Sequence, residues 1–474
     1  MEYSDFPYPK NTPLFPKNTV VANYLRSYAR ELEERGSIRY DTKVNMVKLR
    51  RHKGNDNMWE VVCEHTGSKA VTLEYYHSVV VASGFFTKPR VPPVFQFKPH
   101  SAIDIIHSMH YRLEEQFRGK KVLIVGKGPS YWDMSIAISK VSDGPVLVSV
   151  RDPDNKFVPS QGPASQRVVS EVAKLSAANR KVEFVSNPEE EVDIILLCTG
   201  YTYDFTMIPC VQTSNDDKRV LSLYEHMIFI DEKSDPTVPE DLRKIPIKSV
   251  LGPQKFPGRS TLAFVGLPTM DSAFLVAEAQ SAFIARFLSG RLYKTVPELK
   301  EARDAQAREF NKAVATGKRT LEEFHVLNYP NDAEYVDKLF AECLKAENPA
   351  HMGIGKLPIF HSPELHWVRT PNFPDGGIGS IRDRFNELNI RGGSSFPTVE
   401  SLGFNFDDSA KGVKRDGQTI MAALQTLMEE KRSKWTEDYK AWEKASDEWH
   451  TRWVEKAIEF RDWQLAKDFS SVSI

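Results

Sequence analysis

The stretch VLIVGKGPS at residues 122–130 has the residue types and spacing of a phosphate-binding turn. An apolar strand that runs into such a turn and then a helix can hold the pyrophosphate of a dinucleotide through backbone N–H groups and the positive end of the helix. Gly126 allows the tight turn, Gly128 leaves room for phosphate, and Ser130 can cap the helix and add a hydroxyl donor. Tyr131 stands where the GxGxxG fingerprint has a third Gly or Ala, so a purely structural turn is the alternative.

The end of the next apolar segment, PVLVSVR at 145–151, predicts which dinucleotide would fit. An acidic residue about 20 positions past the glycines binds a ribose 2′-hydroxyl, whereas an arginine there suits a 2′-phosphate. Arg151, with Ser149 beside it, therefore favours NADP over NAD. The alternative is a surface ion pair between Arg151 and Asp152 or Asp154.

Composition argues against several classes of protein. The 474 residues include 63 basic and 64 acidic side chains, so the net charge of -1 gives no field that would attract nucleic acid or a membrane surface. The four cysteines have no metal-ligand spacing, so no metal site is expected. The N-terminus has no apolar signal region, and no stretch approaches the roughly 20 apolar residues of a membrane span. We therefore expect a cytoplasmic protein with neither nucleic acid nor a membrane as partner.

Apolar periodicity predicts an α/β protein, and the length of 474 residues predicts two or three units. Strand, helix and strand alternate over 119–205, which is typical of a Rossmann-like parallel sheet with crossover helices. One helix and three strands are expected before it, and one strand and one helix after it. The expected segments are 20–36 (helix), 38–51, 58–65 and 75–84 (strands); 120–126 (strand), 129–142 (helix), 145–151 and 192–200 (strands); and 261–267 (strand) and 273–290 (helix).

The last part of the chain has a different character. Residues 350–415 are rich in Gly, Pro, Asn and Phe without sustained periodicity, which indicates long ordered loops. Residues 417–468 are predicted to form a charged helix in which Trp435, Trp442 and Trp449 follow one another at intervals of seven. The resulting apolar stripe is expected to pack on the body of the same chain, and a homodimer seam or partner seam is the alternative.

Several segments together resemble the flavin-containing monooxygenase family. They are VVVASGFFTKPRVP (79–92), IIHSMHYR (105–112), GKGPSYWD (126–133), LLCTGYTYDF (196–205), LAFVGL (262–267) and AEAQSAFIARFLSGR (277–291), and they stand in the order found in that family. The resemblance covers roughly residues 1–300. Two positions depart from the family's FxGxxxH pattern, because Ser101 and Ile103 stand where it has Phe and Gly.

The most specific part of the resemblance combines an HxxxYR segment with a TGY segment. Its residues are His107, Tyr111 and Arg112 with Thr199, Gly200 and Tyr201. Tyrosine at position 111 resembles the N- and S-oxygenating branch, whereas the Baeyer–Villiger branch has tryptophan there. The resemblance implies that these six residues bind or orient NADP. For His107, a hydrogen-bonded interior histidine is the alternative.

The resemblance also implies a domain organisation and a second cofactor, FAD. The family has two interleaved dinucleotide folds, and this chain shows only the second glycine fingerprint, so the FAD phosphate-binding unit is expected to be missing. The implied parts are a partial FAD-type segment (1–118), an NADP-binding Rossmann-like domain (119–205), a return segment (206–300) and a C-terminal helical extension (301–474). Gly84, Gly266 and Gln280 resemble positions of the flavin site; the alternatives are a turn, a strand end and a cap or solvent-facing residue.

The function that this resemblance implies is oxygen transfer. A flavin-dependent, NADPH-using monooxygenase would insert one oxygen atom from O2 into a nucleophilic nitrogen or sulfur of a small-molecule substrate. Little acid-base catalysis is required of side chains in such a reaction, so no catalytic residue is assigned. Two alternatives remain: an NADP-binding reductase or nucleotide-sensing module without flavin, and a non-catalytic interaction protein.

Overall fold

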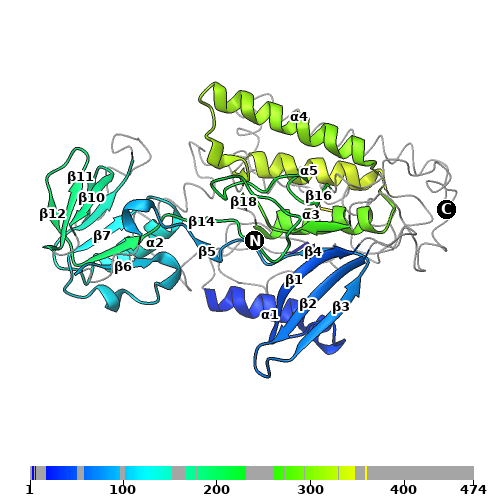
Figure 1. The fold of residues 1–474 in the computed structure, drawn as a ribbon, viewed down its shortest axis with the longest axis horizontal. Coiled ribbons are helices and arrows are strands. Elements are labelled where there is room, and N and C mark those ends of the chain that lie inside the picture. Colours follow the sequence, from blue (N-terminus) through cyan, green and yellow to red (C-terminus); the bar gives the residue numbers. More distant parts are fainter. Residues whose placement is uncertain are drawn as a thin grey trace, which may run out of the picture. The chain divides into compact units, whose positions relative to one another are not determined.

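The structure is a computed structural model. It describes residues 3–4, 6, 18–50, 58–96, 102–151, 166–176, 179–230, 261–270, 273–292, 294–328, 330–346 and 358–359. These residues form two compact units, coloured along the sequence in Figure 1. Unit 1 takes those within 1–83, 205–212 and 219–474, and unit 2 takes those within 84–204 and 213–218.

The centre of unit 2 is a five-stranded parallel sheet with the strand order β6-β13-β7-β8-β9. Its middle strands carry only apolar side chains, VLIV in β7 and IILL in β13, as expected for strands that are covered on both faces. Helix α2 (Pro129–Ile138) connects β7 to β8. The strands are β6 (Asp104–His107), β7 (Val122–Val125), β8 (Val146–Ser149), β9 (Gln166–Val169) and β13 (Ile194–Leu197).

Each face of this sheet has its own core. On one face Ile124 and Val148 pack with residues of α2, including Tyr131 and Ile138. On the other face Leu123 packs with residues of a three-stranded antiparallel sheet. This second sheet consists of β10 (Val172–Ser176), β11 (Lys181–Phe184) and β12 (Glu190–Glu191), and a further pair is formed by β5 (Lys88–Pro89) and β14 (Tyr201–Thr202).

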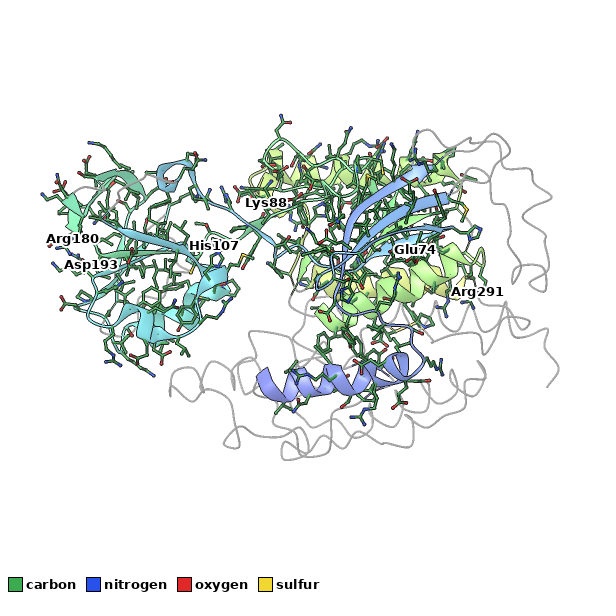
Figure 2. All side chains as sticks on the ribbon, turned by 60° about the horizontal axis from the view of Figure 1, so that its bottom comes forward. Glu74, Lys88, His107, Arg180, Asp193 and Arg291 are labelled. Carbon is green, nitrogen blue, oxygen red and sulfur yellow. The ribbon has the colours of Figure 1, made fainter. Side chains whose placement is uncertain are left out.

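The surface of unit 2 carries ion pairs close to the ends of these strands. The guanidinium of Arg180 lies 2.5 Å from carboxylate oxygens of both Asp193 and Glu191, and Arg180 and Asp193 lie side by side in Figure 2. Arg180 has a positive φ of 55° in the turn between β10 and β11. Exposed pairs of this kind contribute little to stability.

Unit 1 begins with a helix and an antiparallel sheet. In the sheet, Trp59 of the middle strand is buried, and its indole N–H donates a hydrogen bond to Thr261 Oγ1 at 2.8 Å. Along the helix, Tyr24 is buried whereas Leu25 and Leu32 are exposed. The elements are α1 (Asn18–Glu34), β1 (Thr42–Arg50), β2 (Met58–His65) and β3 (Val71–Tyr76).

The main core of unit 1 lies around helix α3 (Ala273–Leu288), which packs against α5 (Asn331–Leu344). A four-stranded sheet, ordered β15-β16-β17-β4, contributes to the same core. Figure 1 shows α3, α4 and α5 gathered in this unit. The remaining elements are β4 (Val79–Val81), β15 (Leu223–Tyr224), β16 (Ile228–Phe229), β17 (Leu262–Phe264), β18 (Thr269–Met270), α4 (Val296–Ala315) and β19 (Val326–Leu327).

The α/β class and the parallel sheet predicted from the sequence are confirmed, and each predicted strand or helix segment up to residue 290 contains an element of the expected type. The domain organisation stays a prediction; the compact unit that holds the parallel sheet takes residues within 84–204 and 213–218, and it includes β6, which pairs with β13. The predicted loops at 350–415 lie almost wholly outside the described residues, and the predicted tryptophan-rich helix at 417–468 lies entirely outside them. Among the helices that are described, none is long and apolar enough to span a membrane.

Candidate functional site

The predicted nucleotide-binding residues of unit 2 gather at one edge of the parallel sheet. Gly126 follows β7, Thr199 follows β13 after one residue, His107 ends β6 and Arg151 lies two residues beyond β8. The chain leaves β7 toward β8 on one side, and β13 lies on the other side, so the carboxyl end of β7 is a point where the strand order reverses. Ligands of open α/β sheets bind at such points.

Gly126 is required by the fold itself. Its φ of 102° lies in a region that L side chains rarely adopt. A Cβ built on it would lie 2.5 Å from the carbonyl oxygen of Cys198, at the end of the neighbouring strand. The N–H of Gly126 donates to the carbonyl oxygen of Ser149 at 3.0 Å. This glycine therefore lets the ends of β7 and β13 approach each other closely.

Gly128 is not required by the fold. Its φ of -72° and ψ of -179° are available to any residue, and a Cβ built on it would meet no atom within 4 Å. It is the N-cap of α2, and no side chain makes a capping hydrogen bond at this helix end. The prediction that Ser130 caps the helix is therefore wrong: Pro129 takes the first helical position, so Ser130 lies inside the first turn.

Tyr131 does not block the turn. Its ring is 4% exposed and belongs to the core between α2 and the sheet, with residues of β7, β8 and β13. The hydroxyl donates to Gln166 Oε1, at the start of β9, at 2.7 Å. The backbone N–H of Tyr131 donates to the carbonyl oxygen of Gly128 at 2.9 Å. The helix thus accommodates a large ring where the fingerprint has a small residue, and the ring points away from the glycines.

Arg151 is exposed at the carboxyl end of β8, the strand next to β7. Ser149, which the sequence placed beside it, is buried, and its hydroxyl donates to the carbonyl oxygen of Ser170 at 3.0 Å. Ser149 is therefore occupied within the fold. The alternative partners of the arginine, Asp152 and Asp154, lie outside the described residues.

His107 is held by two hydrogen bonds to the backbone, and Figure 2 labels it. Its Nδ1 accepts from the N–H of Met109 at 3.2 Å, which requires a free lone pair on that nitrogen. Nε2 therefore carries the proton and donates to the carbonyl oxygen of Gly200 at 3.0 Å. Burial lowers the pKa of His107, so the neutral form is favoured. Both ring nitrogens are occupied, and the histidine orders the TGY segment from within the protein.

The TGY segment is tied down on both sides. Gly200, with a φ of 76°, accepts a second hydrogen bond on its carbonyl oxygen from the N–H of Arg90 at 2.9 Å. The hydroxyl of Thr199 donates to the carbonyl oxygen of Arg90. The ring of Tyr201 stands edge-on to His107, with ring centroids 5.2 Å apart. These three residues therefore form a fixed loop at the carboxyl end of β13.

Tyr111 and Arg112 shape the turn that follows β6. The ring of Tyr111 packs near Phe117, with ring centroids 5.9 Å apart, and burial raises the pKa of its hydroxyl. The guanidinium of Arg112 donates to the carbonyl oxygens of Met109 and Tyr111 at 2.9 and 2.8 Å. Ile103, which replaces the family's glycine, is buried in the core of the sheet.

The three residues predicted for a flavin site do not share one element. Gly84, with a φ of 66°, is the first residue of unit 2, whereas Gly266 and Gln280 belong to unit 1. Gly266, with a φ of 70°, lies in the loop between β17 and α3, and a Cβ built on it would meet no atom within 4 Å. Its N–H donates to Gln280 Oε1 at 2.8 Å. Gln280 is fully buried, so the alternative of a solvent-facing residue is wrong.

Sequence reasoning missed a buried polar group of unit 1. Tyr335 accepts from Gln280 Nε2 at 3.0 Å and donates to the carbonyl oxygen of Glu225 at 2.5 Å. Next to it, the Nδ1 atoms of His226 and His325 lie 2.9 Å apart and share a hydrogen bond. The partners lie 55 to 110 residues apart along the chain, so no local spacing could have revealed them.

The histidine pair is neutral. His325 Nε2 accepts from the N–H of Val220 at 3.0 Å, so His325 Nδ1 carries the proton and donates to His226. Burial lowers the pKa of His226 to about 3, with smaller effects from Lys338 and Arg319, and burial also lowers the pKa of His325. Within the described residues, no group of three or more His, Cys, Asp or Glu side chains could hold a metal ion.

Comparison with protein families gives a match over the first third of the chain. Residues 1–157 match the model of flavin-binding monooxygenase-like proteins. The flavin-containing monooxygenases FMO GS-OX4 and FMO GS-OX3 of Arabidopsis thaliana are each 28% identical to this chain, over 315 and 282 residues. These alignments cover 64% and 59% of this chain, and the chain spans 60% and 54% of the two relatives.

Two solved structures share the fold. The S-allyl-L-cysteine S-oxygenase of Allium sativum aligns with a TM-score of 0.59 and 22% identity, covering 90% of this chain and 82% of that one. Tmm from Pelagibacter aligns with a TM-score of 0.53 and 18% identity, covering 70% of this chain and 65% of that one. Both likenesses support the α/β fold of the chain.

Proposed function

We propose, from the premise that the chain belongs to the flavin-containing monooxygenase family, that it acts as a flavin-dependent, NADPH-using monooxygenase. The substrate would be a small molecule with a nucleophilic nitrogen or sulfur. That atom takes one oxygen of O2, and the other oxygen leaves as water with the hydride of NADPH and a proton. Family relatives use FAD and NADP(H).

The observation that carries this proposal is the contrast between the two glycines of the turn. The fold demands glycine at 126 and makes no demand at 128, where a side chain would extend into open space at the N-terminus of α2. A phosphate needs that space, together with the N–H groups of the first helical turn and the positive end of the helix. The residues present therefore fit the pyrophosphate of a dinucleotide.

Two positions support NADP as the dinucleotide. Arg151 stands at the carboxyl end of the strand next to the turn, where the 2′-phosphate of an adenosine ribose would lie. A guanidinium can bind phosphate through two parallel hydrogen bonds. Ser130, which makes no cap, keeps its hydroxyl in the first turn of α2 and can donate to the same pyrophosphate.

The remaining residues of unit 2 would orient the cofactor without moving protons. His107 is neutral and has both nitrogens bonded to the backbone, so it holds the TGY segment rather than acting as an acid or base. The guanidinium of Arg112 fixes the turn after β6 in the same way. When bound, FAD supplies the redox chemistry that activates O2, and NADPH supplies the hydride.

The flavin would lie against the loop that contains Gly266, where the structure leaves open space beside the main chain. Gln280 contributes by holding this loop, because both polar ends of its amide are engaged inside the protein. Oxygenation of nitrogen or sulfur is proposed because Tyr111 in the HxxxYR segment resembles the N- and S-oxygenating branch rather than the Baeyer–Villiger branch.

The decisive experiment measures NADPH binding in two variants, Gly128→Ala and Arg151→Ala. Gly128→Ala should lower NADPH affinity at least about tenfold while the thermal midpoint stays unchanged, because the methyl group occupies the space for phosphate but clashes with no protein atom. Arg151→Ala should lower the affinity for NADPH at least about tenfold and leave the affinity for NADH unchanged. Both affinities are measured by calorimetric titration of the purified chain.

Activity is then measured with added FAD, NADPH, 18O2 and a thioether or tertiary amine. One 18O atom in the sulfoxide or N-oxide for each NADPH consumed is the expected result. NADPH binding without FAD uptake would replace the proposal with a flavin-free NADP-binding protein. Unchanged NADPH affinity in Gly128→Ala would remove the turn as the cofactor site, and no binding of either nucleotide would favour an interaction protein.

A further inference from the structure

A chain of three hydrogen bonds crosses the core of unit 1 and ends on backbone groups at both sides. The N–H of Gly266 donates to Gln280 Oε1 at 2.8 Å, Gln280 Nε2 donates to the hydroxyl of Tyr335 at 3.0 Å, and that hydroxyl donates to the carbonyl oxygen of Glu225 at 2.5 Å. The group, called the amide relay below, links β17–α3, α3, α5 and the β15–β16 turn. Its direction is fixed, because a backbone N–H can only donate and a backbone carbonyl can only accept.

The far end of the relay is a rigid anchor. Glu225 and His226 both have positive φ angles, 47° and 55°, in a tight turn that closes with the N–H of Met227 donating to Tyr224 at 3.0 Å. Residues other than glycine adopt such angles at a cost in free energy, which contacts with the surroundings must offset. Helix α5 supplies that support twice, through the Tyr335 hydroxyl and through Lys338, whose Nζ lies 2.5 Å from the Glu225 carboxylate.

The Tyr335 hydroxyl keeps its proton under all ordinary conditions. Burial, with a smaller effect from Glu225, raises the pKa of Tyr335 well above its usual value. It therefore remains able to donate to Glu225 and to accept from Gln280 at the same time. This double role keeps the Gln280 amide oriented with its oxygen toward Gly266.

Besides the amide relay to α5, the loop after β17 has a second attachment to residues near the start of that helix. Strand β18 (Thr269–Met270) pairs in parallel with β19 (Val326–Leu327), which lies just before α5. On its other side the loop is joined to β4, because the N–H of Val265 donates to Val81 at 2.9 Å. The segment 265–270 is thus fixed at three places, two of which depend on residues beyond 320.

We propose that Tyr335 is a positioning residue that fixes the loop 265–270 through the amide relay, so that helix α5 controls the wall of the flavin site. The part of this inference that concerns flavin rests on the proposed function. The part that concerns the loop rests on the contacts alone. Tyr335 itself touches the loop only through Gln280, so it acts at a distance from any ligand.

Amide hydrogen exchange of the purified chain, without any cofactor, tests the relay. Tyr335→Phe removes the hydroxyl and keeps the ring, so the N–H of Gly266 should exchange at least about tenfold faster. The control is Tyr224→Phe, which removes a hydroxyl from the same core but not from the relay, and should change that exchange by less than about twofold. Exchange in β7 of unit 2 should be unaffected in both variants. Equal acceleration in the two variants would overturn the relay.

A second variant guards against general loosening of the core. Gln280→Met keeps the volume but removes both bonds of the amide. If the relay is one unit, the double variant with Tyr335→Phe should exchange at Gly266 no faster than Gln280→Met alone, because the hydroxyl acts only through the amide. Independent, multiplying effects would show that Tyr335 supports the fold generally and would refute its positioning role.

The link to flavin is read from the affinities of two cofactors. Tyr335→Phe should lower the affinity for FAD at least about tenfold and shift the visible absorption of bound FAD. The affinity for NADPH, which depends on unit 2, should stay the same. Equal losses for both cofactors, or none for FAD, would refute control of the flavin wall. If the unmodified chain takes up no FAD, the proposed function fails and so does the flavin part of this inference, and the exchange experiment still decides the relay.

Discussion

The two units build their polar sites in opposite ways. In unit 2 the candidate residues follow the ends of neighbouring parallel strands, so the sheet itself brings Gly126, Thr199 and His107 to one edge. In unit 1 the amide relay joins four segments whose bonded residues lie 14, 55 and 110 positions apart in sequence, and its side chains are buried. Where backbone geometry defines a site, a short motif can predict it. Where side chains from distant segments define it, no motif exists.

The largest effect is expected from Gly126→Ala, which tests whether unit 2 depends on backbone geometry. A methyl group there would meet the Cys198 carbonyl at 2.5 Å, and the φ of 102° would be strained as well. We expect a loss of about 3 kcal/mol or more in the unfolding free energy of unit 2. Urea denaturation with hydrogen exchange read separately in each unit measures it. A loss like that of Gly128→Ala would show that the two glycines are equivalent.

Acidification should act on unit 1, where the buried histidine pair lies. The pKa values of His226 and His325 are lowered in the folded state, so the unfolded chain binds more protons below about pH 6.5. The unfolding free energy of unit 1 therefore has its full value above that pH and decreases as the pH falls. From pH 7 to 5.5, protonation of these two histidines in the unfolded chain should lower the unfolding free energy of unit 1 by roughly 2 to 3 kcal/mol.

The matched variant for this pH effect is His325→Leu, measured at the same two pH values. It should be less stable at pH 7, because the N–H of Val220 loses its acceptor. It should also lose about half as much stability on acidification, since one titrating group is gone. An undiminished pH dependence in the variant would place the acid sensitivity elsewhere.

The smallest effect concerns a local motif, which shows that short spacing can also be informative in unit 1. Thr295 and Glu298 form a capping box at the start of α4: the N–H of Glu298 donates to the Thr295 hydroxyl at 3.3 Å, and the N–H of Thr295 donates to the Glu298 carboxylate at 2.6 Å. Thr295→Ala should cost about 1 kcal/mol in unit 1 by urea denaturation. No loss would mean that the exposed cap is not formed in solution.

The sequence predicted the elements of unit 2 well, because strands buried on both faces read as unbroken apolar runs, such as IILL in β13. It predicted the role of Ser130 wrongly, because Pro129 starts the helix and leaves Gly128 as its cap. It did not predict that β6 joins the same sheet, because β6 precedes the apolar run of β7 and its pairing with β13 is revealed only by the fold.

The candidate site in unit 1 could not be predicted to the same depth. The resemblance pointed to Gly266 and Gln280, but the hydroxyl that orients the glutamine lies 55 residues farther along the chain. The histidine pair spans 99 residues. Local spacing carries no information about such partners, whereas the TxxE sequence at 295–298 could have revealed the capping box.

The parallel pairing of β18 with β19 has a consequence for where the chain can be shortened. Strand β19 lies between α4 and α5, whereas β18 lies shortly before α3. An early stop codon at about residue 320 would therefore remove β19, the pairing partner of a segment about fifty residues upstream. A shortened protein of this kind would retain Gly126, Gly128 and Gly266 but would lose the contacts from β19 and α5 that hold the loop after β17 in place.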